Sequence, residues 1–476
     1  MAPPNSGAQT LTAADVLLLR QEAEAIDETI TALKAQLVQL EDRQKAIQDK
    51  LSTLTFPVQT LPAEIFCHIF RATLSSTDPR KVNAMLLSIT AVCQRWRRIA
   101  IADPNLWTTT CYFLQGRDHF DPVFSHFLER TQGLPITVHV DAREESWLPP
   151  PLFTSCRQWK EASLSLAGAN AIKIGLGLDS ASIDNILDLP HLTKLTLDLG
   201  FYMEYQEDQT FSNAPLLRDL AIGDAVLISG LGFPVHQLQK LTLLHTLSLS
   251  DLVALLPQLV VLEDLTLCDE CDEGDVQSTQ PPVEMPCLTT LRLSGYHSHT
   301  IMAYVLLPRL RNLELSDLDG VTAESDVLEC LSRSSANVSS LSIADTEYST
   351  FSTLLNSPAI GGALRDLTIG SLQMGPSDNA ALVALFSRAD FLPNIESLMF
   401  VPPPVASFSS FLHTFLDGLA QRVADASLRG LAHEIKLQRL LVQPSAPATS
   451  LRAEDLRAVR DLQQRLNIHG HVPDKY

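Results

Sequence analysis

A short pattern of aliphatic residues recurs along the chain beyond residue 130, and it constrains the fold more than any other feature. Each unit consists of an aliphatic residue, two variable residues, a leucine, one more variable residue and a final apolar residue. The central leucine recurs after 18 to 31 residues, which leaves room for one short strand and one return segment. Nine units are clear, and they begin at Leu192, Leu217, Leu244, Leu262, Leu288, Leu310, Val338, Leu364 and Ile395.

The alternation inside each unit is typical of a strand that presents its aliphatic side chains to one face. Repetition of such units predicts a parallel sheet, in which the aliphatic residues pack between successive coils and a helix or irregular segment closes each turn. Further strands are expected at 134–140, at 164–166 and within 434–442. The units resemble irregular leucine-rich repeats, because the asparagine that often follows the strand in that family is missing from most of them.

A second periodic pattern occupies residues 16–54, where seam positions alternate between steps of three and four. Eleven of the twelve seam residues are apolar, which is typical of a coiled coil held for more than five heptads. The helix is expected to end before Pro57. The seam residues are Val16, Leu19, Ala23, Ile26, Ile30, Leu33, Leu37, Leu40, Gln44, Ile47, Leu51 and Leu54.

Two interpretations of this helix stay open at the level of sequence. One is a homodimer, or pairing with another helix, through residues 15–55; the other is a helix that packs against its own protein. A parallel homodimer would place Glu22 opposite Asp27, so the flanking charges specify a parallel register only weakly.

The segment after this helix predicts a small helical unit. A first helix opens near Pro62, which is tolerated in a first turn because its missing N–H has no partner there. Ile65 and Ile69 share one face of this helix, and Phe66 and Phe70 share the next. The unit is too small to bury all of these side chains, so some are expected to contact a partner.

A second helix is expected from about Val82. Val92 and Trp96 lie along one face of it, and Asp103-Pro104 ends it before Leu106-Trp107. The segment thus predicts three short helices within about fifty residues.

These residues resemble an F-box in order and spacing from end to end, with a somewhat long polar loop at 75–81. The arrangement of the whole chain is similar to fungal F-box domain-containing proteins in which a heptad helix precedes the F-box and a leucine-rich region follows. The matching motifs are Leu61-Pro62-x-Glu64-Ile65-x3-Ile69-Phe70, Val92-Cys93-x2-Trp96-Arg97-x-Ile99-Ala100 and Leu106-Trp107.

The resemblance implies a function. An F-box docks on a Skp-type adaptor and so on a cullin scaffold with a RING protein, which would make this chain the substrate receptor of a ubiquitin ligase. The matching positions are expected to carry the adaptor contact or to hold its helices; they are Leu61, Pro62, Ile65, Ile69, Val92, Cys93, Trp96 and Trp107.

Charge narrows the range of partners. The chain has 35 Lys and Arg against 55 Asp and Glu, a net charge of −20, and residues 131–445 hold 17 of the bases and 37 of the acids. This excess of acidic residues argues against nucleic acid or an anionic membrane as the main partner, because both are negatively charged. No apolar run reaches the roughly 18 residues of a membrane span and no secretory signal is visible, so a cytoplasmic or nuclear location is expected.

The residues between the core aliphatics of each strand are expected to face outward and to form a target-binding surface. Aspartate recurs at or just beyond the strand ends, which indicates either an acidic rim for a basic target protein or ordinary turn chemistry, in which aspartate is favoured anyway. The candidate target-binding residues are Asp198, Asp251, Asp269, Arg292, Glu314, Asp317 and Asp345.

The sequence predicts no enzyme, cofactor or metal. Cys268 and Cys271, with Cys287, His297 and His299 nearby, fit no compact zinc module, and no nucleotide or catalytic motif occurs. The favoured function is therefore a non-catalytic adaptor. The alternatives are a scaffold or inhibitor without ubiquitin transfer, and an unrecognised hydrolase.

Together these patterns predict an α/β solenoid, a leucine-rich-repeat horseshoe preceded by a small three-helix F-box and a long N-terminal coiled-coil helix. The expected parts are a disordered tip at 1–14, the coiled-coil helix at 15–56, the F-box at 57–110, the solenoid at 111–445 and a capping segment with a helix at 446–476.

Overall fold

A computed structural model describes most of the chain. The predictions for residues 1–12 and for nearly all of 446–476 lie outside the described residues. The chain divides into two compact units, Met1–Ala72 and Thr73–Tyr476. The described residues are 13–53, 57–78, 81–113, 120–142, 152, 154–166, 186–198, 209–223, 228, 232–244, 247–268, 271–272, 281–295, 297–317, 323–370, 372–373, 378–388, 391–401, 416, 418–422, 437–442, 460 and 464.

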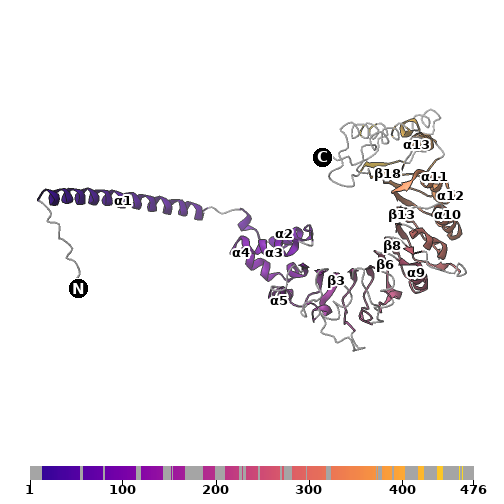
Figure 1. Cartoon of the computed structure of the whole chain (residues 1–476), viewed down its shortest axis with the longest axis horizontal. Helices are drawn as coiled ribbons and strands as arrows, with labels where there is room; N and C mark the ends of the chain where they lie inside the picture. The colour runs from indigo at the N-terminus through magenta and orange to yellow at the C-terminus, as the bar shows by residue number, and fades with distance from the viewer. Residues whose placement is uncertain are drawn as a thin grey trace, which may run out of the picture. The chain divides into compact units, whose positions relative to one another are not determined.

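The first unit begins with one long helix, α1 (Ala13–Thr53), drawn unbroken in Figure 1. This confirms the predicted N-terminal helix. Every side chain from Ala14 to Lys50 is exposed, including the apolar seam. A 3-10 turn η1 (Pro57–Thr60) then leads to α2 (Ala63–Ser75), whose last residues belong to the second unit. Among the described residues, no helix is long and apolar enough to cross a membrane.

The second unit continues with α3 (Val82–Val92), α4 (Gln94–Ala102), the 3-10 turn η3 (Pro104–Trp107) and α5 (Phe120–Thr131). The expectation of one unbroken helix from Val82 to Asp103 is wrong. Cys93 is extended, with φ −159° and ψ 169°, and it separates α3 from α4.

The largest element is an open parallel sheet of 13 strands, whose order in space follows their order in the chain. Its last twelve strands come after the helical unit. The predicted large parallel sheet is therefore confirmed. The strands are β1 (Thr109–Phe113), β2 (Ile136–Ala142), β3 (Trp159–Leu166), β4 (Lys194–Asp198), β5 (Asp219–Ile222), β6 (Lys240–Leu243), β8 (Asp264–Cys268), β11 (Thr290–Ser294), β13 (Asn312–Ser316), β14 (Ser340–Ala344), β16 (Asp366–Ile369), β18 (Ser397–Phe400) and β19 (Arg439–Val442).

Helices and short turns connect the strands. In Figure 1, α9, α10, α11 and α12 follow one another along the same side of the sheet and leave its other side open. The helices are α9 (Leu249–Leu255), α10 (Ala323–Ser334), α11 (Tyr348–Asn356), α12 (Pro358–Gly361) and α13 (Asp378–Ser387), with 3-10 turns η4 (Cys156–Gln158), η5 (Val235–Gln237), η6 (Leu256–Gln258) and η7 (Ser298–Tyr304). Three two-stranded parallel pairs complete the connections: β7 (Leu247–Ser248) with β9 (Cys271–Asp272), β10 (Val283–Glu284) with β12 (Val305–Leu306), and β15 (Thr346–Glu347) with β17 (Leu372–Gln373).

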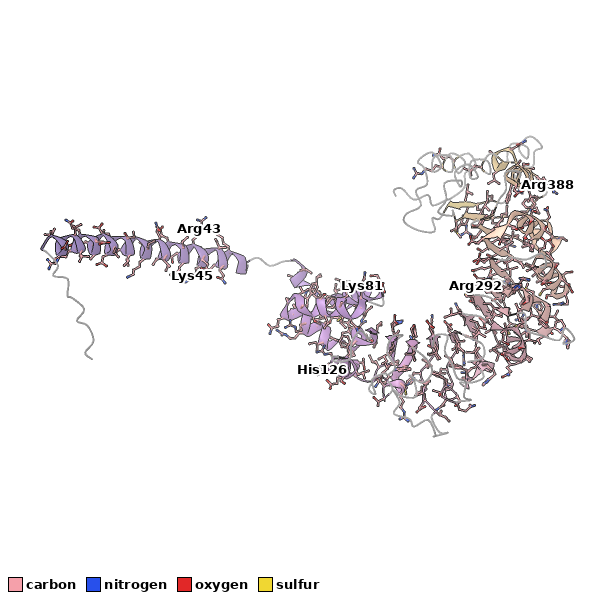
Figure 2. The ribbon with its side chains drawn as sticks, viewed as in Figure 1. Arg43, Lys45, Lys81, His126, Arg292 and Arg388 are labelled. Carbon is pink, nitrogen blue, oxygen red and sulfur yellow. The ribbon has the colours of Figure 1, made fainter. Side chains whose placement is uncertain are left out.

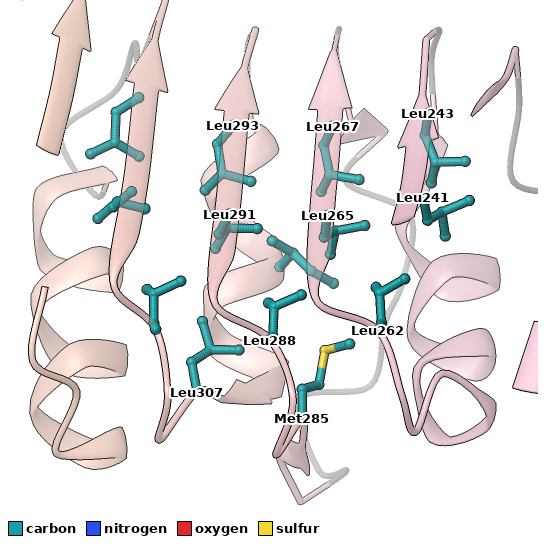
Figure 3. Close-up of a cluster of buried hydrophobic side chains, with 14 of the residues drawn as sticks. Leu241, Leu243, Leu262, Leu265, Leu267, Met285, Leu288, Leu291, Leu293 and Leu307 are labelled. Atoms are coloured by element: carbon teal, nitrogen blue, oxygen red, sulfur yellow. The ribbon is translucent and has the colours of Figure 1, made fainter. Parts of the chain in front are cut away.

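The core lies between the sheet and this helical layer. Leu265 aligns with Leu291, and Leu267 with Leu293, in the parallel register of β8 and β11, and all four side chains are at most 1% exposed. Figure 3 shows the leucines of successive strands pointing to the same side of the sheet. Since each fully buried leucine stabilises the fold by about 1.5–3 kcal/mol relative to an exposed one, the repeated leucines hold the strands in one register.

One repeat unit lies six residues earlier than its predicted position. The predicted central leucine, Leu247, lies in β7, outside the large sheet; instead residues 238–243 supply β6, in which Leu241 and Leu243 are fully buried. Both hexapeptides fit the pattern, so the pattern alone could not decide between them. In the later hexapeptide, the hydroxyl of Ser248 accepts a hydrogen bond from the backbone of Asp251 and caps α9.

Candidate protein-binding surfaces

Helix α2 separates its two apolar stripes as the spacing predicts. Phe66 and Phe70 are each 1% exposed, and their ring centroids lie 5.7 Å apart. Ile65 and Ile69, one residue away on the helix, are each 44% exposed. Two exposed β-branched side chains four residues apart form an apolar ridge that a partner could cover with a gain in free energy.

The residues that lead into α2 are only partly covered. Leu61 is half-buried, and Pro62 is exposed and accepts a hydrogen bond from the backbone of Phe66 through its carbonyl, at 3.4 Å. Val58 nearby is 43% exposed. The predicted adaptor-binding residues of this segment therefore present apolar surface to solvent.

In α3 and α4 the predicted residues take different roles. Val92 is 59% exposed at the end of α3, whereas Trp96 is half-buried. The thiol of Cys93 accepts a hydrogen bond from the backbone of Trp96 at 3.5 Å, so it caps the first turn of α4. Arg97 ties the two helices together, because its Nε donates to the carbonyl of Thr90 at 2.9 Å.

Trp107 is a structural residue rather than a contact residue. Its side chain is fully buried, its Nε1 donates to the carbonyl of Ala100 at 2.8 Å, and its ring meets Phe127 edge-on with centroids 5.0 Å apart. The guanidinium of Arg130 lies 4.2 Å from its ring centroid. Of the two roles predicted for Trp107, contacting the adaptor or holding the helices, its burial and contacts favour the second, because this side chain anchors η3 to α4 and α5.

Three further apolar side chains on these helices are exposed and were not singled out from the sequence: Met85 at 36%, Leu87 at 49% and Ile101 at 40%. Met85 lies two helical turns before Val92, so the two share a face of α3. That spacing was the signal that could have identified Met85.

The open side of the sheet carries a ladder of opposite charges. In the parallel register Lys194, Asp219, Lys240 and Asp264 are consecutive partners on β4, β5, β6 and β8. The Lys194 ammonium lies 3.4 Å from the Asp219 carboxylate, and the Lys240 ammonium lies 3.5 Å from that of Asp264. Sequence reasoning missed this ladder, because the misplaced unit put Thr246 where Lys240 belongs.

Arg292 extends the ladder across β11, where Figure 2 labels it. Its Nη1 pairs with Asp264 and its Nε lies 3.0 Å from a carboxylate oxygen of Glu314 on β13. Burial alone would lower the pKa of Arg292, but the hydrogen bonds and charges of Asp264 and Glu314 outweigh it, so the pKa is raised. Two predicted target-binding residues, Arg292 and Glu314, are thus brought together, and Asp219, Asp264 and Glu314 each have a basic neighbour.

The predicted aspartates lie at several places. Asp198 ends β4, and Asp251 is exposed in the first turn of α9, where a negative charge suits the helix dipole. Asp317 and Asp345 directly follow the neighbouring strands β13 and β14, with φ of 52° and 50°. Aspartate tolerates this left-handed conformation better than most residues, which favours the turn interpretation at these two positions. Asp269 lies outside the described residues.

A polar cavity of about 690 Å³ opens at the edge where β13 to β18 begin. Arg311, Ser339, Arg365 and Glu396 directly precede four successive strands and line it, together with Asn337 and Asn394 from the return segments. The guanidinium of Arg365 lies 3.3 Å from the carboxylate of Glu396. Sequence reasoning did not identify this cavity, because the residue before a strand has no fixed chemistry in the repeat.

The comparisons with known proteins address only the helical unit. No curated protein matches the chain. Residues 58–112 match the F-box-like family, and this range includes α2, α3, α4 and η3. The chain therefore carries an F-box-like domain between its long N-terminal helix and its large parallel sheet.

Proposed function

We propose that this chain is the substrate-recognition subunit of a Skp–cullin–F-box type ubiquitin ligase. The observation that carries the proposal is the F-box-like match at 58–112, followed by the last twelve strands of a parallel sheet with an open polar side. Domains of this family commonly dock on Skp-type adaptors. The proposed role is non-catalytic and needs no cofactor.

The adaptor contact is proposed to use the exposed apolar side chains of the F-box-like domain. Ile65 and Ile69 on α2 and Val92 on α3 are between 44% and 59% exposed, although an apolar side chain gains stability when it is buried. Leu61 and Pro62, at the start of α2, are proposed to take part in the contact as well. Cys93 and Trp107 act indirectly, because they fix the start of α4 and the position of η3.

The sheet is proposed to be a leucine-rich-repeat solenoid that binds the target protein. Its strands follow one another in parallel register, and the eight strands from β4 to β16 each contribute two buried aliphatic residues to a continuous core. Repeat proteins of this kind bind partners on the surface that their stacked units expose. Because its charges are already paired, the ladder from Lys194 to Glu314 suits a polar target more than a strongly basic one.

The proposal is tested by purifying the tagged full-length chain from cells and probing for the Skp-type adaptor, the cullin and ubiquitin-transfer activity. Ile65→Asp with Ile69→Asp is expected to remove the adaptor and the cullin together, because two charges would have to be buried in the contact. The matched control is His68→Asp with Arg71→Asp, which places the same groups on exposed positions of another face of α2.

If the unaltered chain is purified without any adaptor, the proposal is overturned. If the adaptor is recovered without the cullin, the chain is instead a scaffold or inhibitor that does not support ubiquitin transfer. Target proteins should accumulate equally when the chain is removed and when it carries the two Asp substitutions.

A further inference from the structure

We infer that α1 pairs with α1 of a second copy of this chain in an antiparallel coiled coil of one defined register. This inference is independent of the proposed ligase function, because it uses only residues 15–50. Its starting point is the exposed apolar seam of α1, in which Leu19, Leu33, Leu37 and Leu40 are each at least 50% exposed.

The charges of α1 are distributed unequally along its length. The first half, residues 13–32, holds five acidic residues and one basic residue, whereas residues 33–53 hold three acidic and four basic residues. A parallel pair sets the acidic halves against each other. An antiparallel pair sets each acidic half against the more basic half of the other copy, which is electrostatically favourable.

The seam of an antiparallel pair permits registers that differ by one heptad, and in one of these registers the helices overlap almost completely. Each seam layer of an antiparallel pair places an a position of one helix against a d position of the other. In the centred arrangement Ile30 of one copy lies against Leu33 of the other. Overlap then runs from residue 13 to residue 50, about 56 Å of helix. Moving outward from the centre, the layers are Ile30 with Leu33, Ile26 with Leu37, Ala23 with Leu40, Leu19 with Gln44, and Val16 with Ile47.

In this register the residues that flank the seam are complementary throughout. In an antiparallel pair, e positions of the heptad face e positions and g positions face g positions, which brings together four oppositely charged combinations and two neutral ones. Each combination occurs twice by symmetry. They are Arg20 with Glu41, Asp27 with Lys34, Glu22 with Arg43, Asp15 with Lys50, Thr29 with Gln36, and Ala13 with Gln48.

Neighbouring arrangements lose this match. A shift of one heptad in one direction places Asp27 against Glu41 and Lys34 against itself, and a shift in the other direction places Arg20 against Lys34 and Asp27 against itself. The parallel pair places Glu22 against Asp27. The flanking charges therefore specify the centred antiparallel register, and Figure 2 shows that Arg43 of this set lies on a different side of α1 from the outer residue Lys45.

The test exchanges the charges of one flanking pair in the full-length protein and measures the dimer dissociation constant by analytical ultracentrifugation. Asp27→Lys places the introduced ammonium group against Lys34 twice, and we expect about tenfold weaker dimerisation. Lys34→Asp should weaken it similarly, and the double exchange should restore the original affinity. In a parallel dimer Asp27→Lys would strengthen binding, because the introduced ammonium group would face Glu22.

The controls make the same charge changes at outer positions of α1. Asp42→Lys, Lys45→Asp and their combination should change the dissociation constant less than twofold. Ile30→Asp with Leu37→Asp should abolish the dimer. A monomeric unaltered chain overturns the inference, as does a dimer that Asp27→Lys strengthens or that the double exchange does not restore.

Discussion

The position of β6 gives a sharp test of how the repeats are arranged. Leu241 is fully buried in the register between Leu220 of β5 and Leu265 of β8, whereas Leu244, three residues later, is only half-buried. The two residues are the second leucine of the observed unit and the first leucine of the unit expected from the pattern. Replacing each with alanine therefore separates the two arrangements.

Leu241→Ala removes a fully buried side chain between two neighbouring strands, and substitutions of this kind cost about 3 kcal/mol. Because Leu244 is only half-buried, Leu244→Ala removes less buried apolar surface, and we expect it to lower the free energy of unfolding by about 1 kcal/mol. Urea-induced unfolding followed by circular dichroism measures both, with unaltered slopes showing that the surface exposed on unfolding is unchanged. Equal costs, or a larger cost for Leu244→Ala, would refute the assignment of β6.

Three further predictions follow from the described contacts. Trp107→Phe leaves the Ala100 carbonyl without its donor in a buried place and should lower the free energy of unfolding by about 2 kcal/mol, measured by urea unfolding, with adaptor binding retained at temperatures where the domain is folded. Arg292→Met should cost about 1 kcal/mol and reduce the dependence of stability on salt, because Asp264 and Glu314 lose their shared partner; an unchanged salt dependence would contradict the ladder. Burial lowers the pKa of His139 below its ordinary value of 6.5, and the nearby Glu161 offsets this only in part. The stability that neutral His139 contributes is therefore present above pH 6.5 and is lost as the pH falls from 6.5 through the folded pKa. His139→Gln should accordingly make the melting temperature depend less on pH over that range.

The repeats were accessible from the sequence because burial imposes a strict rule on them. Every second residue of a strand must be apolar, and the central leucine of eight predicted units lies where the pattern placed it. Where two overlapping hexapeptides both fit, as at 238–243 and 244–249, periodicity carries no further information. The choice depends on which leucines meet their neighbours, and that is a tertiary property.

The helices of the F-box-like domain were also predictable only in part from the sequence. The four-residue spacings of α2 predicted its two stripes, but they did not indicate that the phenylalanine stripe is buried and the isoleucine stripe exposed. The break at Cys93 was missed, because a thiol is a weak capping group and the residues on either side of it are compatible with a helix. Trp107 could not be assigned to core or contact before its partners Ala100 and Phe127 were known.

The charge ladder could not be predicted without knowing the register of the strands. Lys194, Asp219, Lys240 and Asp264 are at least 21 residues apart in sequence, and they become a ladder only when β4, β5, β6 and β8 are aligned. The net charge indicated an acidic sheet, whereas the contacts show that Asp219, Asp264 and Glu314 in this ladder have basic neighbours.

The most direct test of the account is a titration of the full-length chain with a purified Skp-type adaptor by isothermal calorimetry. We predict a saturable complex of one adaptor per chain, with a negative heat-capacity change because apolar surface is buried. Ile65→Asp with Ile69→Asp should weaken binding at least a hundredfold, or about 2.7 kcal/mol, while His68→Asp with Arg71→Asp binds as the unaltered chain does. If the folded, unaltered chain does not bind, or if both variants bind equally well, the result contradicts the central claim that Ile65 and Ile69 of the F-box-like domain recruit the adaptor.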